Sequence, residues 1–230
     1  MISKQQAIDR LRSEGYHISK NRFTPSYFKS LNFKISTLFD VGVNKGTPNL
    51  YAAFENAKMV LIDPQEMELS NLEDWQKEKY NFEFIHKALG NKHEKKIFFR
   101  SDISARSSFL RRNDLRKKKE LFEEKEVDII TLDSLVTEDR YNGPYGIKLD
   151  IEGYELKALE GASRALKNTE FIILESSVKP RFEGGVSFSD LVCFLKDNEF
   201  ELYDILTPLI KAPTVIDCLF VKKNSALMRL

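Results

Sequence analysis

Short apolar runs alternate along this chain with stretches in which apolar residues recur at helical spacing. Such alternation predicts a single α/β domain whose seven-stranded, mostly parallel sheet carries helices on both faces and ends in an antiparallel strand. Strands are predicted at residues 37–41, 58–62, 96–100, 127–132, 145–149, 171–175, 200–206 and 216–221, and within 82–90, whose last residues form an exit loop. Helices are predicted at residues 3–13, 48–54, 65–80, 155–166 and 189–198.

The first apolar run, residues 37–41, stops at a turn built from small residues. Gly42 and Gly46 can adopt backbone angles that other residues resist, and they let a ligand approach the main chain closely. Pro48 then suits the first turn of a helix. A strand, a glycine turn and a helix form the context of a nucleotide-type loop, because the free N–H groups at a helix start attract negative charge.

An acidic residue ends the next predicted strand at the distance that such a site requires. Asp63 follows the apolar run 58–62 and lies 23 residues after Asp40. In a βαβ unit an acid about 20 residues beyond the turn can accept hydrogen bonds from both ribose hydroxyls. A plain turn with a surface aspartate would also fit each feature alone, but the two together favour a cofactor site. The spacing of Gly42 and Gly46 lacks the G-x-G-x-x-G form of a dinucleotide loop.

Two motifs carry a resemblance to a known family. Residues 39–46, Phe-Asp-Val-Gly-Val-Asn-Lys-Gly, resemble the first motif of class I S-adenosylmethionine-dependent methyltransferases, and most closely the FDVGAN-x-G pattern of the FkbM-type family. Residues 147–155, Ile-Lys-Leu-Asp-Ile-Glu-Gly-Tyr-Glu, are similar to the second signature of that family. Val43 stands where alanine is usual and Asp63 where glutamate is more frequent, and both departures keep the chemistry. The resemblance covers residues 35–223.

The resemblance implies a Rossmann-like class I methyltransferase domain over residues 35–230, with an inserted segment at 96–132. Residues 1–34 are then a helical arm or cap, which is either packed on the domain or placed over its site. The implied cofactor is S-adenosyl-L-methionine. The residues that the resemblance and the strand ends predict as its ligands are Asp40, Gly42, Asn44, Gly46, Asp63, Pro64, Ala88, Leu89 and Asp150.

Four acids, Asp40, Asp63, Asp150 and Glu175, each end a predicted strand. Ligands of open α/β sheets bind at the carboxyl ends of the strands, so we expect these acids over one crevice. Burying carboxylates together is costly unless cations or hydrogen-bond donors meet them. S-adenosyl-L-methionine supplies cations through its sulfonium and α-amino groups and hydrogen-bond donors through its ribose hydroxyls. Asp150 and Glu175 are the two candidates for the catalytic base, and the sequence does not choose between them.

Other acids and the remaining polar residues suggest no metal centre. Glu155 begins a predicted helix, where negative charge is favourable for structural reasons alone. The three histidines lack metal-ligand spacing. No metal is therefore predicted, although a divalent cation at Asp150 and Glu175 remains compatible with the residues.

Composition narrows the partners. The 230 residues carry a net charge of +1, which favours neither nucleic acid nor a membrane surface, and the acids around the basic run at 111–119 balance it. No apolar run is long enough to span a bilayer, and Cys193 and Cys218 form no C-x-x-C pair. A cytoplasmic protein without a nucleic-acid partner is predicted. Its oligomeric state stays open.

The predicted reaction is methylation of a hydroxyl on a sugar, a glycan or a natural-product glycoside. A nucleotide-cofactor oxidoreductase is one alternative, which the glycine spacing disfavours; a non-catalytic binding module on the same fold is another. Cover over the strand ends is expected from the arm, from residues 102–126 and from residues 176–188. These segments predict a polar, hydroxyl-bearing acceptor that can also be anionic, through the rings and cations of Tyr16, Tyr27, Arg106, Arg111, Lys179 and Arg181.

Overall fold

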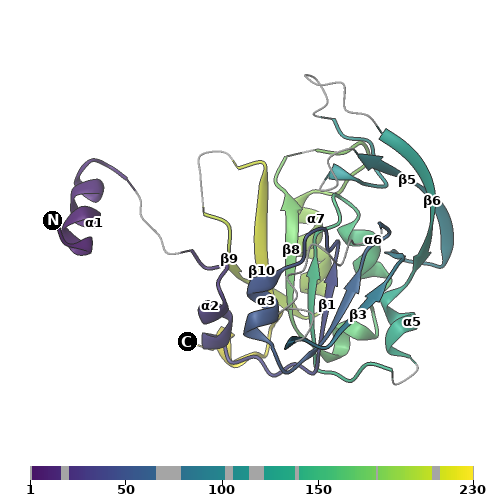
Figure 1. Cartoon of the computed structure of the whole chain (residues 1–230), viewed down its shortest axis with the longest axis horizontal. Helices are drawn as coiled ribbons and strands as arrows, with labels where there is room; N and C mark the ends of the chain where they lie inside the picture. Colours follow the sequence, from purple (N-terminus) through teal and green to yellow (C-terminus); the bar gives the residue numbers. More distant parts are fainter. Residues whose placement is uncertain are drawn as a thin grey trace.

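The computed structural model shows an α/β protein built on two sheets (Figure 1). None of the described helices is long and apolar enough to cross a membrane. The structure describes residues 2–16, 21–65, 79–101, 106–113, 122–137, 140–179, 181–208 and 213–229.

The main sheet has seven strands in the order β3-β2-β1-β7-β8-β10-β9. Neighbours from β3 to β8 pair in parallel, whereas β10 is antiparallel to both β8 and β9. The prediction of a seven-stranded, mostly parallel sheet with an antiparallel final strand is thus confirmed. Its strands are β1 (Thr37–Val41), β2 (Lys58–Ile62), β3 (Phe82–Ile85), β7 (Tyr145–Leu149), β8 (Thr169–Ser177), β9 (Phe200–Ile205) and β10 (Val215–Lys222).

Successive side chains of each strand point to opposite faces of this sheet, so the core is divided between the two faces. On β1, Leu38 packs in one apolar cluster and Phe39 in the other, and all five residues of the strand are buried. Because both faces are covered, the central strands read as continuous apolar runs. Helices α2 (Pro25–Ser30) and α3 (Pro48–Ala53) cover one face, whereas α5 (Leu132–Val136), α6 (Glu155–Glu160) and α7 (Phe188–Asp197) cover the other.

A second sheet of three strands, in the order β4-β6-β5, rises beside the first (Figure 1). It contains β4 (Ala88–Leu89), β5 (Glu94–Ser101) and β6 (Phe122–Ile130), and β5 and β6 form an antiparallel pair. The sequence predicted one strand and its exit loop at 82–90, but the chain forms two strands there, in different sheets.

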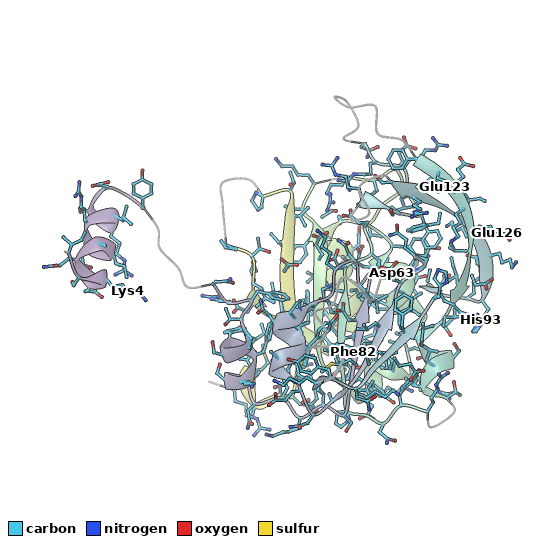
Figure 2. All side chains as sticks on the ribbon, in the orientation of Figure 1. Lys4, Asp63, Phe82, His93, Glu123 and Glu126 are labelled. Atoms are coloured by element: carbon cyan, nitrogen blue, oxygen red, sulfur yellow. The ribbon has the colours of Figure 1, made fainter. Side chains whose placement is uncertain are left out.

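Strand β6 also begins earlier than the apolar pattern predicted. Residues 122–126 are mostly charged, so no apolar pattern marks them as a strand. These side chains are exposed and pair across the two strands, with Lys95 Nζ 3.3 Å from Glu126 Oε1 and Arg100 Nη1 3.5 Å from Glu123 Oε2. Figure 2 shows Glu123 and Glu126 along the outer part of this hairpin.

The helix predicted at 155–166 is in fact two pieces, α6 and the 3₁₀ helix η3 (Ala165–Asn168). A Cβ on Gly161 would lie 2.0 Å from the carbonyl oxygen of Gly90, so the chain turns there against the small sheet. Asp133 accepts hydrogen bonds from the backbone N–H groups of Arg164 and Ala165 and caps the second piece. The helix predicted at 65–80 falls almost wholly outside the described residues.

The N-terminal segment is packed in one part and exposed in another. Helix α1 (Lys4–Ser13) buries no residue and stands apart from the sheets in Figure 1, and Ser3 caps its N-terminus. In contrast, Phe28 of α2 is completely buried. The division into an arm of residues 1–34 and a domain of residues 35–230 stays a prediction.

Candidate functional site

A cleft opens where the carboxyl ends of β1, β2 and β7 meet the small sheet, and we call it the first cleft. Its empty space amounts to about 730 Å³, part of it open to solvent, which is within the usual range of small-molecule sites. Figure 2 shows Asp63 in this central region. The lining consists of Val41, Gly42, Asn44, Ile62, Asp63, Pro64, Gln65, Ala88, Leu89, Phe98, Ser107, Phe109, Asp150, Ile151, Glu152, Tyr154 and Glu175.

The glycine turn after β1 has the unusual backbone that its sequence predicted. Gly42 has φ +77°, Asn44 has φ +46° and Gly46 has φ +83°. A Cβ on Gly42 would lie only 1.9 Å from the main-chain oxygen of Asp150. Gly42 is therefore required by the backbone that leaves β7, in addition to any ligand that approaches the turn.

Asp63 connects this turn to the end of β2. Its Oδ2 accepts hydrogen bonds from the N–H groups of Val43 (2.9 Å) and Asn44 (3.3 Å), and its Oδ1 accepts one from Gln65 (2.8 Å). Burial raises the pKa of Asp63, and the three N–H groups oppose that shift. A carboxylate has about four acceptor positions, so Asp63 can still accept a hydrogen bond from a ligand hydroxyl.

Aromatic residues that the sequence analysis did not select form the opposite wall of the first cleft. Phe98 and Phe109 meet edge to face with ring centroids 5.1 Å apart, and Phe109 lies 4.7 Å from Tyr154. Ala88 and Leu89, which were predicted as cofactor ligands, line the same cleft from β4. The wall depends on the pairing of β5 with β6, which no local pattern reveals.

Asp40 takes a different position from the other predicted ligands. It is fully buried and lies outside the lining of the first cleft. Its Oδ2 accepts from the hydroxyl of Tyr51 at 2.5 Å, and its Oδ1 lies 3.2 Å from Nζ of Lys148, its partner in the β1–β7 register. The structure therefore places Asp40 beneath the site, where it holds Lys148.

Lys148 joins this buried pair to the cleft. Its Nζ lies 3.4 Å from Oδ2 of Asp150, which is partly exposed. Burial alone would lower the pKa of Lys148, but the carboxylates of Asp40 and Asp150 outweigh it and raise the pKa above its ordinary value. Lys148 thus stays charged and orients Asp150 at the end of β7.

A second cleft lies on the other side of Asp150 and Glu175, with about 700 Å³ of empty space. It shares Asn44, Asp150 and Glu175 with the first cleft. Its lining consists of Phe23, Val43, Asn44, Lys45, Gly46, Thr47, Lys148, Asp150, Glu175 and Asp217.

Glu175 therefore borders both clefts. Burial raises its pKa to about 8, the nearby carboxylates of Asp150 and Glu152 add to the rise, and the guanidinium of Arg181 opposes it. Nη1 of Arg181 lies 3.4 Å from Oε2 of Glu175. A carboxyl with this pKa can gain and lose a proton near neutral pH.

A pair of arginines supports the rim of the first cleft. Glu152, with φ +53°, receives Arg112 Nη1 at 3.0 Å and Arg181 Nη2 at 2.7 Å on the same carboxylate oxygen. Both guanidinium groups lie 5.2 Å from the ring centroid of Phe182. This cluster links the loop after β8 to residues 111–113, so the two loops are held together beside the catalytic candidates.

Asp217 belongs to the site although the sequence analysis did not select it. It lies on β10 opposite Glu175 in the register, and its pKa is raised by burial and, in smaller measure, by Asp150. The sequence does contain a signal for Asp217. An antiparallel strand begins at the sheet edge where its parallel neighbours end, so an acid near the start of the last strand is expected beside the acids at the other strand ends. Glu155, by contrast, has the structural role that was expected, because it accepts hydrogen bonds from the N–H groups of Ile151 and Gly153.

The predicted cover is mostly placed elsewhere. Tyr27 bonds to Asp204, Arg111 lies over the ring of Phe99, and Arg181 pairs with acids of the rim. The basic residues 116–119 lie outside the described residues. None of the six side chains proposed as cover, Tyr16, Tyr27, Arg106, Arg111, Lys179 and Arg181, lines either cleft.

The predicted cofactor residues otherwise gather as expected. Gly42, Asn44 and Asp63 line the first cleft, Gly46 lines the second, and Asp150 lines both. Pro64 lines the first cleft as well. In the described part of the chain, no group of three or more histidine, cysteine, aspartate or glutamate side chains is arranged to hold a metal ion.

Comparison with known proteins connects this geometry to a family. The family model of the methyltransferase FkbM domain matches residues 40–202. Curated proteins gave no match.

Solved structures with a similar chain course include several methyltransferases. One is magnesium protoporphyrin IX methyltransferase from Synechocystis with bound S-adenosylmethionine (12% identity, 95% of this chain and 92% of that one, TM-score 0.46). Another is a putative methyltransferase from Streptococcus mutans in complex with S-adenosylhomocysteine (15% identity, 90% and 99%, TM-score 0.47). The assignment to the family rests on the match of the family model to residues 40–202.

Proposed function

Since this chain belongs to the FkbM family of methyltransferases, we propose that it methylates a hydroxyl oxygen of a sugar, a glycan or a natural-product glycoside. Use of S-adenosyl-L-methionine follows from the family, whereas the oxygen acceptor and its class are the proposal. The observation that carries it is the position of Glu175 on both clefts, because a hydroxyl, unlike most nitrogen acceptors, needs a base beside the methyl donor.

The residues of the first cleft fit the cofactor. Asp63 retains acceptor capacity for ribose hydroxyls, and Leu89, Phe98 and Phe109 present apolar surface suited to a purine ring. Asp150 supplies negative charge for a cationic ligand, and Glu175 adds to it when it is deprotonated. When bound, S-adenosyl-L-methionine supplies a methyl group already activated by its sulfonium centre.

We assign the proton-accepting role to Glu175 and an orienting role to Asp150. Asp150 is paired with the charged Lys148, which is itself held by the buried Asp40. Glu175 has no lysine partner among the described residues, and its raised pKa of about 8 suits it to remove a proton from a hydroxyl as the methyl group is transferred. The chain thus aligns the acceptor with Asp150 and takes its proton with Glu175.

The test uses the purified protein in two steps. Calorimetry with S-adenosylhomocysteine is expected to give one binding site per chain. Incubation with S-adenosyl-L-methionine and a panel of glycosides is then expected to yield an O-methylated product, located by mass spectrometry and NMR. Methylation of nitrogen or carbon acceptors alone would contradict the proposal. Salt-sensitive RNA binding in a shift assay would contradict the prediction that no nucleic acid is bound.

A further inference from the structure

The second cleft is a separate cavity, but it borders the place where the reaction must occur. It meets the first cleft at Asn44, Asp150 and Glu175, so a molecule in it touches the same two carboxyl groups as the cofactor. With the first cleft filled by the cofactor, the second cleft offers about 700 Å³ of empty space, part of it open to solvent, next to those groups.

The acidic side chains of the second cleft outnumber its cations, and Asp150 and Asp217 supply most of the negative charge near neutral pH because the pKa of Glu175 is raised to about 8. Asp150, Glu175 and Asp217 line the cleft, against the cations Lys45 and Lys148. Nζ of Lys148 lies 3.2 Å from the fully buried carboxylate of Asp40, so much of its charge is already compensated. Lys45 is exposed at the rim. An anion in this cleft would face three carboxyl groups, whereas hydroxyl or amine donors would find acceptors on all three.

An aromatic side chain from far away in the sequence completes the wall. Phe23 precedes α2, and its main-chain oxygen accepts a hydrogen bond from Nδ2 of Asn49 at 2.9 Å. Its ring meets the buried Phe28 edge to face at 5.3 Å. Arg22 and Tyr27, on either side, both bind the carboxylate of Asp204 on β9. The residues around Phe23 are thus fastened to the domain at three points, and Phe23 presents an apolar face to the cleft.

We propose that the second cleft is the acceptor subsite and that it takes a hydroxyl- or amine-bearing ring without negative charge, packed against Phe23. This inference rests on the proposed function and deepens it. It also reverses one expectation from the sequence, because the cations that favoured an anionic acceptor line neither cleft. The flat C–H face of a sugar ring matches the aromatic wall, and its hydroxyls match Asp217, Asp150 and Glu175.

Three probes that differ only at C6 test the preference for a ring without negative charge: methyl glucoside, methyl 6-amino-6-deoxyglucoside and methyl glucuronide. Binding is measured by saturation-transfer NMR titration with S-adenosylhomocysteine at saturation. We expect the neutral and amine probes to bind at least about tenfold more tightly than the glucuronide, the order of one uncompensated charge contact in a partly buried site.

Two variants and one control test whether the probes bind next to Asp217 and Phe23. Asp217→Asn should narrow the gap between glucoside and glucuronide by about three- to tenfold, and Phe23→Ala should weaken all three probes by a similar factor. Asp128→Asn removes the same charge from an exposed position on β6 and should leave the probes unchanged. Each variant should bind S-adenosylhomocysteine within about twofold of the parent, which also shows that it is folded.

Failure of the proposed function and failure of the acceptor subsite give different results. Loss of S-adenosylhomocysteine binding by the parent protein would overturn the proposed function and this inference with it. With that binding intact, a glucuronide that binds as well as the glucoside, an unchanged gap in Asp217→Asn, or no signal from any probe would overturn the acceptor subsite alone.

Discussion

The two clefts share three residues, yet they are built in different ways. The first cleft is lined by Gly42 and Asn44 of the glycine turn, by Asp63 at the next strand end and by an apolar and aromatic wall that includes Leu89, Phe98 and Phe109. The second cleft is lined by residues 43–47 of the same turn, by charged side chains on or next to β7, β8 and β10, and by a ring from the N-terminal segment. The glycine turn thus contacts both clefts, and the difference lies in the apolar and aromatic wall of the first and the charged side chains of the second. The comparison suggests that cofactor and acceptor binding can be altered independently.

The largest effect should come from Glu175, where the two clefts meet. Glu175→Gln removes the proposed base without a change of shape, and we expect kcat to fall about 10²- to 10⁴-fold. Calorimetry should show nearly normal affinity for S-adenosylhomocysteine. In the parent protein kcat/KM should rise with pH through about 8, because the carboxylate is the active form. If Asp150→Asn loses more activity than Glu175→Gln, the roles of the two acids are exchanged.

The second prediction concerns the turn of the first cleft. Gly42→Ala should lower the free energy of unfolding by roughly 2–4 kcal/mol and abolish measurable cofactor binding, because the new Cβ would meet Asp150 O at 1.9 Å. Gly184→Ala is the matched control: its φ is also positive, +67°, but nothing lies within 4 Å of the added carbon. It should lose only about 1–2 kcal/mol. Equal losses in urea unfolding would mean that the clash at Gly42 relaxes.

The third prediction separates two buried acids of neighbouring strands. Asp63→Ala should weaken S-adenosylmethionine binding by about 1.5–3 kcal/mol, the scale for lost hydrogen bonds to a charged group. Asp40→Asn should instead reduce stability and leave affinity nearly unchanged, since Asp40 touches Tyr51 and Lys148 and lies outside the first cleft. Calorimetry on both variants decides this. An Asp40 variant with the larger loss of affinity would restore Asp40 as a cofactor ligand.

The smallest effect is on stability and follows from the pKa of Glu175. The carboxyl releases its proton near pH 4.5 in an unfolded chain and near pH 8 in the folded protein. Between these values the folded state holds a proton that the unfolded state has lost, so this contribution to stability falls as pH rises. Glu175→Gln should remove this dependence of stability on pH and stabilise the protein at pH 8.5 by roughly 1–3 kcal/mol. This is less than the full pKa difference would give, because the side chain is partly exposed to solvent. Urea unfolding of the parent and of Glu175→Gln at pH 5 and pH 8.5 measures this difference in stability. An equal change in the free energy of unfolding between the two pH values in both proteins would refute the prediction.

Several elements could be predicted because their causes are local. Continuous apolar runs ended by polar residues placed β1, β2 and β7 correctly, since a parallel strand covered on both faces has no other pattern. The positive φ of Gly42 and Gly46 followed from residue type alone. Where charge and exposure dominate, as in β6, the pattern failed, because pairing across the hairpin decided the conformation.

The sequence by itself determined the central strands of the main sheet, the glycine turn, the acid at the end of β2 and, through two short motifs, the family, because each of these signals lies in residues close together in the chain. Tertiary structure decided which acids face a ligand. It buried Asp40 behind Lys148, brought Asp217 beside Glu175 and carried Phe23 to the wall of the second cleft. The physical reason is that a side chain acquires its environment from neighbours across strands and loops, which no local spacing specifies. The same residue type therefore serves as a structural anchor on β1 and as a site residue on β10.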